Sequence, residues 1–320
     1  QAILSCRSLK NDMAIGKDDL SGLLRRGRAL HAQICSQESF STGAGDASEA
    51  DWPLHRVVFI SLRRQAQRRR DFLQQLSRFP GLCARAEWLQ ATDGAQCKLS
   101  EELAPHIVTS EGVVDALTPR ETVVGYVLTR GAIGLAISLH KALSLIAQDG
   151  DEGHVHLLCE DDAMLSPDFV ESFAQLRTVA EAHDCSWEVL HLGYQPACTT
   201  VKPCGGEKCT EANYLLGVPT ELFGMYGLAL PPRGARALLQ KMFPVSLQVD
   251  TELSRAYRHL RKAEGDTRRR AFCPDIDDGP ALRAYAPHFP IVVAPSSRAD
   301  CTDIQVIDRK NYEQQYGVER

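Results

Sequence analysis

The stretch Val155-His-Leu-Leu-Cys-Glu-Asp-Asp162 decides the fold class, because an apolar run stops abruptly at three adjacent carboxylates. A short, nearly continuous apolar run is typical of a strand buried inside an α/β sheet. Ligands in such folds gather beyond the carboxyl ends of the strands. Three acids at that position repel one another unless a cation or a proton compensates. Oxygen donors suit Mg²⁺ or Mn²⁺, whose usual companions are substrate phosphates. We therefore expect a metal–diphosphate site at Glu160, Asp161 and Asp162; the alternative is a solvated loop before the next helix.

Alternating strands and helices around this stretch predict an α/β domain with a mostly parallel central sheet flanked by helices. We expect strands at 57–62, 86–89, 155–159, 188–192, 225–230 and 290–294. We expect helices in the Arg-rich run that follows the first strand and continues through Leu76, and at 131–148, 168–182, 233–242 and 251–262. Residues 95–130 lack periodicity and predict a surface excursion. Residues 1–50 read as an extension and linker, and residues 51–320 as the main domain.

Composition narrows the function classes. The chain has 320 residues, 44% of them hydrophobic, and a net charge of −5, which gives no support to a nucleic-acid partner. No run of 18 apolar residues exists, so no transmembrane segment is expected in the chain shown. No phosphate-loop or Rossmann glycine motif occurs. The eleven cysteines, an odd number, leave at least one thiol free if no partner chain is involved, and Cys159 looks like a reduced core residue.

The colinear order of several short motifs resembles glycosyltransferase family 25, which contains lipooligosaccharide and procollagen galactosyltransferases. The motifs are Ile60-Ser-Leu-Arg63 continuing to Arg69, Thr92-Asp-Gly94, Leu128-Thr-Arg-Gly-Ala-Ile-Gly134 continuing to Ser138, Glu160-Asp-Asp162, Trp187–Gly193, Tyr226–Leu239 and Val249-Asp250. The resemblance runs over about residues 56–308. It departs from the family pattern at Ala132, where the family has Glu, and at Leu139, where it has His; His140 is displaced by one position.

The resemblance implies a GT-A-type nucleotide-sugar-binding fold and an inverting, metal-dependent transferase. Such an enzyme moves galactose or glucose from a UDP-sugar to a hydroxyl, with Mn²⁺ or Mg²⁺ as cofactor. The acceptor stays open between a glycan, a lipid-linked saccharide and a protein. The compartment is also open between the cytoplasm and the lumen of the endoplasmic reticulum or Golgi: odd cysteines and missing glycosylation sequons favour a reducing interior, whereas eukaryotic members of the family work in the lumen of the endoplasmic reticulum.

The resemblance and the chemistry together assign candidate roles. Asp162 is the first choice for direct metal contact, with Asp161 beside it and His288 as a possible third ligand. A general base is needed to take the proton of the acceptor hydroxyl, and Asp250 is preferred over Glu252; an N-cap role for Asp250 is the alternative. Candidate donor-binding residues are Ile60, Leu62, Arg63, Arg68, Asp93, Ser138, His140, Glu160 and Asp161.

Several of these residues have simpler structural readings. An arginine run such as the one containing Arg63 and Arg68 more often forms the solvent-exposed face of a helix. Asp93 suits a plain Asp-Gly turn equally well, and His140 on an apolar face suits a core histidine. Two other function classes also remain: a non-catalytic carbohydrate- or nucleotide-binding relative, favoured by Ala132 and Leu139, and a metal-dependent phosphoesterase, which would normally want more ligands.

Overall fold

The computed structural model describes residues 52–96, 105–117, 128–194, 200–203, 217–221, 224–257, 282–287 and 289–294. Within these ranges the strands are β1 Arg56–Ser61, β2 Ala86–Gln90, β3 His156–Glu160, β4 Met164–Leu165, β5 Val189–Gly193, β6 Thr200–Pro203, β7 Gly217–Glu221, β8 Gly227–Leu230, β9 Ala284–Tyr285 and β10 Val292–Val293. The helices are α3 Ala66–Leu76, α4 Pro80–Cys83, α5 Ser110–Leu117, α6 Arg130–Ala147, α7 Phe169–His183, α8 Pro232–Met242 and α9 Val249–Tyr257. The predicted extension 1–50, most of the cysteine loop and His288 lie outside the described residues.

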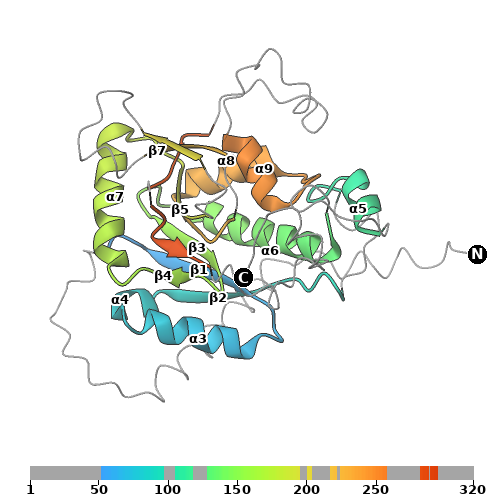
Figure 1. Cartoon of the computed structure of the whole chain (residues 1–320), viewed down its shortest axis with the longest axis horizontal. Helices are drawn as coiled ribbons and strands as arrows, with labels where there is room; N and C mark the ends of the chain where they lie inside the picture. The colour runs from blue at the N-terminus through green and yellow to red at the C-terminus, as the bar shows by residue number, and fades with distance from the viewer. Residues whose placement is uncertain are drawn as a thin grey trace, which may run out of the picture.

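A six-stranded, mostly parallel sheet forms the centre of the molecule (Figure 1), in the order β2-β1-β3-β8-β5-β9. Strand β1 pairs in parallel with both β2 and β3, and β5 pairs in parallel with β9. Strand β8 alone runs antiparallel, between β3 and β5. The expectation of an α/β fold with a mostly parallel sheet is therefore confirmed.

Helices cover both faces of the sheet because its central strands are apolar on both sides. Val58 and Ile60 of β1 face the core formed with α6, α8 and α9. Val57 and Phe59 face the opposite core, formed with α3, α4 and α7. Phe59 packs against Phe72 of α3 with ring centroids 4.9 Å apart, and loss of such a buried ring costs about 3–5 kcal/mol. The two cores fix the strand ends, and hence any site built on them.

Helix α6 is the most apolar helix and lies against the sheet. By length and composition alone it would suit a membrane span, but 56% of that window is buried inside the fold, which accounts for its apolar character. It begins with Thr129, whose side chain caps the amide of Ala132. A Cβ on Gly134 would lie 2.6 Å from the carbonyl oxygen of Thr92. Only glycine therefore lets α6 approach the turn after β2 this closely.

Several boundaries differ from those the sequence predicted. Helix α7 begins at Phe169, with Asp168 as its N-cap residue, so Ser166 and Pro167 precede the helix. Helix α9 begins at Val249, two residues earlier than predicted, and is described only to Tyr257. The run near Val292 pairs with β4 outside the central sheet. Helix α5 lies in the stretch for which no periodicity was found.

Candidate functional site

The three carboxylates Glu160, Asp161 and Asp162 lie at the carboxyl edge of the sheet, as predicted. Glu160 ends β3, and the backbone amide of Asp161 donates to the carbonyl of Ile60 at the end of β1 (3.1 Å). The hydroxyl of Ser61 donates to Asp161 Oδ2 at 2.5 Å. The β1–β3 pairing therefore fixes the acids relative to the sheet. Asp161 is buried, so the alternative of a solvated loop does not describe it.

Arg68 pairs with two of the three acids. Its Nη2 lies 2.5 Å from Asp161 Oδ1 and 2.9 Å from Asp162 Oδ2. This guanidinium reaches the carboxyl edge from the first turn of α3, so Arg68 is part of the acidic cluster. Arg68 is therefore not simply part of a solvent-exposed helix face. Arg63, by contrast, is exposed in the turn after β1.

Arg69 has a structural role beside the cluster. It is buried, donates through Nη2 to the carbonyl of Arg63 at 3.0 Å and through Nη1 to the carbonyl of Leu62, and stacks on Trp88 with 4.2 Å from Cζ to the ring centroid. It thereby holds the turn after β1. Leu62 and Arg63 were expected to contact the donor; their carbonyls serve Arg69, and the side chain of Ile60 is buried in the core.

The acidic cluster carries more negative charge than Arg68 offsets. Burial, followed by the charges of Asp162 and Asp161, raises the pKa of Glu160 to about 8. Burial also raises the pKa of Asp161, against the opposing effects of the Ser61 hydrogen bond and Arg68. Carboxylate oxygens suit a hard divalent cation, which would relieve this repulsion, although among the described residues no three of these acids have donor oxygens within 4.8 Å of one another.

Asp250 lies on α9, a helix far along the chain, and acts on the acidic cluster through its charge. Its charge contributes to the raised pKa of Glu160. Burial raises the pKa of Asp250 itself, while hydrogen bonds from the Thr251 and Gly224 amides oppose the shift. Asp250 is the second residue of α9 and not its N-cap, and its Oδ1 accepts from the Thr251 amide at 2.8 Å. The alternative N-cap role predicted for Asp250 is therefore wrong.

A buried histidine supports the backbone beside Asp250. His191 of β5 is fully buried, and burial lowers its pKa to about 4. As a neutral ring it donates from Nε2 to the carbonyls of Gly193 (2.8 Å) and Gly224 (3.1 Å) and accepts at Nδ1 from the Tyr257 hydroxyl (3.2 Å). Gly224 has φ +84°, a conformation that favours glycine. Sequence reasoning missed His191, although a histidine inside the apolar run 189–193 was a visible signal.

Glu252, the second candidate base, has a structural role. Its Oε1 accepts from the amides of Ser246 (2.8 Å) and Leu247 (2.9 Å) and from the Ser246 hydroxyl (2.9 Å). Its Oε2 pairs with Arg255 at 2.9 Å. Both carboxylate oxygens are thus occupied by partners inside the fold. The predicted role of Glu252 as a general base is therefore corrected to a structural one, in which it holds the loop that leads into α9.

The remaining predicted donor-binding residues do not join the acids. Ser138 is fully buried; it accepts from the Thr92 amide (2.8 Å) and donates to the Gly134 carbonyl (2.6 Å), which leaves no surface for a ligand. His140 packs edge-on against Phe243, with centroids 5.0 Å apart, and burial lowers its pKa. His140 is therefore packed against other side chains, in line with the alternative of a core histidine.

Asp93 lies in a turn near the end of β2. Its Oδ1 accepts from the Ala95 amide at 3.1 Å, and its Oδ2 pairs with Arg64. This is the Asx turn that Asp-Gly favours. No ligand role is needed to explain Asp93.

Comparisons with known proteins add no family: no protein-family model matches the chain, and no curated protein matches its sequence. The resemblance to glycosyltransferase family 25 stays a prediction.

Proposed function

We propose that the protein is a metal-dependent glycosyltransferase that moves galactose or glucose from a UDP-sugar to an acceptor hydroxyl. The observation that carries the proposal is the row of three carboxylates, Glu160, Asp161 and Asp162, at the carboxyl edge of an α/β sheet, with Ser61 and Arg68 holding Asp161 and with the charge of Asp250 acting on Glu160 from a distant segment. This edge is where α/β proteins bind nucleotides. The mostly parallel sheet is compatible with the GT-A-type fold that the motif order implies.

The residues divide between the leaving group and the acceptor. Asp161 and Asp162 would hold Mn²⁺ or Mg²⁺, which supplies positive charge for the departing diphosphate. Ser61 and Arg68 orient these two carboxylates. Asp250 accepts the proton of the acceptor hydroxyl. At the same time the hydroxyl oxygen bonds to the anomeric carbon of the sugar, and the bond between that carbon and the diphosphate breaks. A raised pKa suits Asp250 for this role, because a base works best when its pKa approaches the working pH.

Release of UDP tests the proposal. The protein is incubated with UDP-galactose or UDP-glucose and Mn²⁺, with water as the default acceptor, and UDP is measured over time. Asp162→Asn should abolish the release, while Asp71→Asn, an exposed carboxylate on α3, serves as the matched control and should keep it. The proposal is overturned if neither sugar nucleotide yields UDP and neither UDP nor Mn²⁺ raises the melting temperature.

A second candidate, a non-catalytic nucleotide-sugar-binding protein, is favoured by Arg68. This guanidinium already contacts both Asp161 and Asp162, so a cation of the protein's own stands between the expected metal ligands. This candidate predicts that UDP stabilises the protein equally with and without Mn²⁺ and that no UDP is released from the sugar nucleotides.

A further inference from the structure

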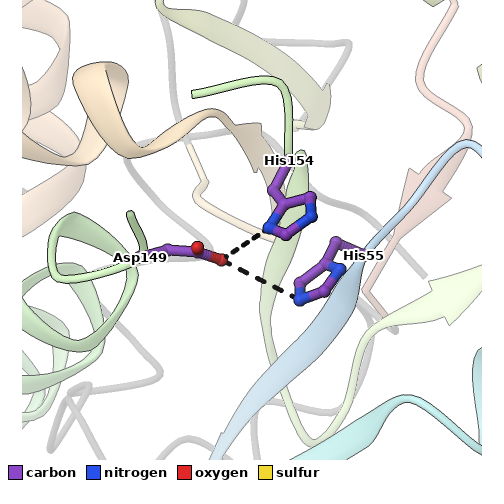
Figure 2. A group of neighbouring side chains, drawn as sticks. All are labelled: His55, Asp149 and His154. Carbon is purple, nitrogen blue, oxygen red and sulfur yellow. Dashed lines mark hydrogen bonds and ion pairs between the residues drawn. The ribbon is translucent and has the colours of Figure 1, made fainter. Parts of the chain in front are cut away.

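A group of metal-ligating side chains lies at the opposite, amino-terminal edge of the same sheet. His55 precedes β1, Asp149 follows α6, His154 lies in the turn before β3, and His156 is the first residue of β3. Figure 2 shows the rings of His55 and His154 turned toward the carboxylate of Asp149. Donor atoms of His55, Asp149 and His154 lie within 4.8 Å of one another. The cluster is separate from the acids, because β3 spans roughly 13 Å between His156 and Glu160.

The donor atoms converge on one oxygen. Asp149 Oδ2 lies 3.0 Å from His154 Nδ1, 3.1 Å from His156 Nε2 and 3.9 Å from His55 Nε2. Zn²⁺ binds imidazole nitrogen and carboxylate oxygen at about 2.0–2.1 Å in a tetrahedron, which places neighbouring donors about 3.3 Å apart. The three observed distances bracket this value. Small side-chain adjustments would therefore bring the donors of His55, Asp149 and His154 around one ion, whereas His156, which is close to Asp149 but outside that group of three, would have to turn further.

His156 provides a second, independent sign of a missing partner. Its side chain is fully buried, and neither of its ring nitrogens makes a hydrogen bond, although Nε2 lies beside the Asp149 carboxylate. Leaving a buried polar group without a partner is costly. A cation in contact with Nε2 would remove the part of that cost that belongs to Nε2.

The surroundings suit a cation better than a set of protonated histidines. The rings of His55 and His154 stack 3.6 Å apart, 6° from parallel, an arrangement that two imidazolium ions would oppose. His154 Nε2 lies 3.4 Å from Asp151 Oδ2. A carboxylate on the far ring nitrogen is the usual support of a metal-bound histidine.

We propose that His55, Asp149 and His154 form a Zn²⁺ site, with the buried His156 beside Asp149 as the candidate for the fourth donor. Two imidazoles and one carboxylate match the donor preference of zinc, and His156 would complete a closed, structural site. The ion joins the end of α6 to the starts of the two central strands β1 and β3. The partly exposed ring of His55 gives an entry path.

Zinc binding to the purified, tag-free chain tests the site. After chelator treatment and dialysis against Zn²⁺, bound metal is measured by mass spectrometry and affinity by competition with a chromophoric chelator. The wild type should retain one equivalent. The double variant His55→Ala/His154→Ala should bind at least about 100-fold more weakly. His183→Ala, an exposed histidine on α7, is the matched control and should bind as the wild type does.

Two further variants keep the result unambiguous. Asp161→Asn/Asp162→Asn should retain the zinc; loss of zinc in that variant would place the ion at the acidic edge and overturn the proposal. His156→Leu fills the same buried space without a donor and should weaken binding if His156 is a ligand, with circular dichroism of the metal-free protein as the folding check. Retention of one equivalent by the His55→Ala/His154→Ala variant, or none by the wild type, would also overturn the proposal.

Discussion

The two edges of the central sheet differ in the chemistry they assemble. At the carboxyl edge, Asp161 and Asp162 are held by a hydroxyl and a guanidinium, and Glu160 and Asp250 add further oxygen donors. At the amino edge, three imidazoles surround one carboxylate oxygen. Hard ions that accompany phosphates suit the first set, and zinc suits the second. One scaffold can thus present two sites of different selectivity, and four predictions test that contrast.

The largest expected effect is the loss of activity at the acidic edge. Asp162→Asn should reduce UDP release from UDP-galactose with Mn²⁺ by at least about 100-fold, because it removes a charge that would help to stabilise the leaving diphosphate. His55→Ala/His154→Ala, at the other edge, should leave the rate unchanged. Equal rates in Asp162→Asn and wild type would remove the functional distinction between the edges.

The second prediction separates two carboxylates on α9. Glu252→Ala should lower the free energy of unfolding by about 3 kcal/mol, because it leaves the Ser246 and Leu247 amides and Arg255 without their buried acceptor. Asp250→Asn should keep most of the stability and lose UDP release. Urea denaturation and the UDP assay, applied to both variants, measure the two effects. The assignment of Asp250 as the base fails if its variant remains fully active.

The third prediction concerns acid sensitivity at His191. Its pKa is about 4 in the fold and 6.5 as a model value, so the unfolded chain binds the proton more readily. This contribution to stability is complete above pH 6.5 and is lost as the pH falls toward 4, by up to ~3 kcal/mol.

His191→Gln should therefore lose stability less steeply than wild type between pH 7 and pH 4, as followed by urea midpoints. His156 keeps its own contribution in both proteins, so the difference between the two curves isolates His191. Parallel curves would mean that His191 titrates normally in the folded state.

The smallest expected effect is the coupling between the edges. Zinc at the histidines should change UDP affinity by less than about 2-fold, because no described side chain touches both sites. Coupling is reciprocal, so UDP should alter zinc affinity equally little. Calorimetric titration of UDP with and without one equivalent of zinc measures this, with His55→Ala/His154→Ala as the control. A coupling of tenfold or more would show that the two edges act as one system.

Much of the fold could be predicted from local sequence patterns. The apolar runs around Val58, Leu157 and Leu190 became central strands because burial on both faces requires continuous hydrophobicity. The short strands β4 and β9 have only two residues each, too few for a periodic signal, whereas β10, equally short, lies in the apolar run 290–294. The carboxyl-edge acids were predictable because strand ends on one edge meet in space.

The partners of these acids were harder to predict. Asp250 and Glu252 are two residues apart on one helix, yet the charge of Asp250 acts on Glu160 while Glu252 binds the amides of its own loop, a distinction set by tertiary packing. The four amino-edge residues come from three segments, and only the His154-x-His156 pair gave a local signal. His55 joins that pair through the pairing of β1 with β3, and Asp149 comes from the end of α6.

The reversed direction of β8 has a topological consequence for evolution of the acidic edge. A parallel strand would enter from the amino edge, but β8 enters from the edge where β5 leaves, so Gly193 and Gly224 are held side by side by His191, which bonds to both carbonyls. The chain between these anchors departs from and returns to one rim. Insertions or deletions there would change the neighbourhood of the carboxylates while the sheet order stays the same, which gives this rim freedom to diversify.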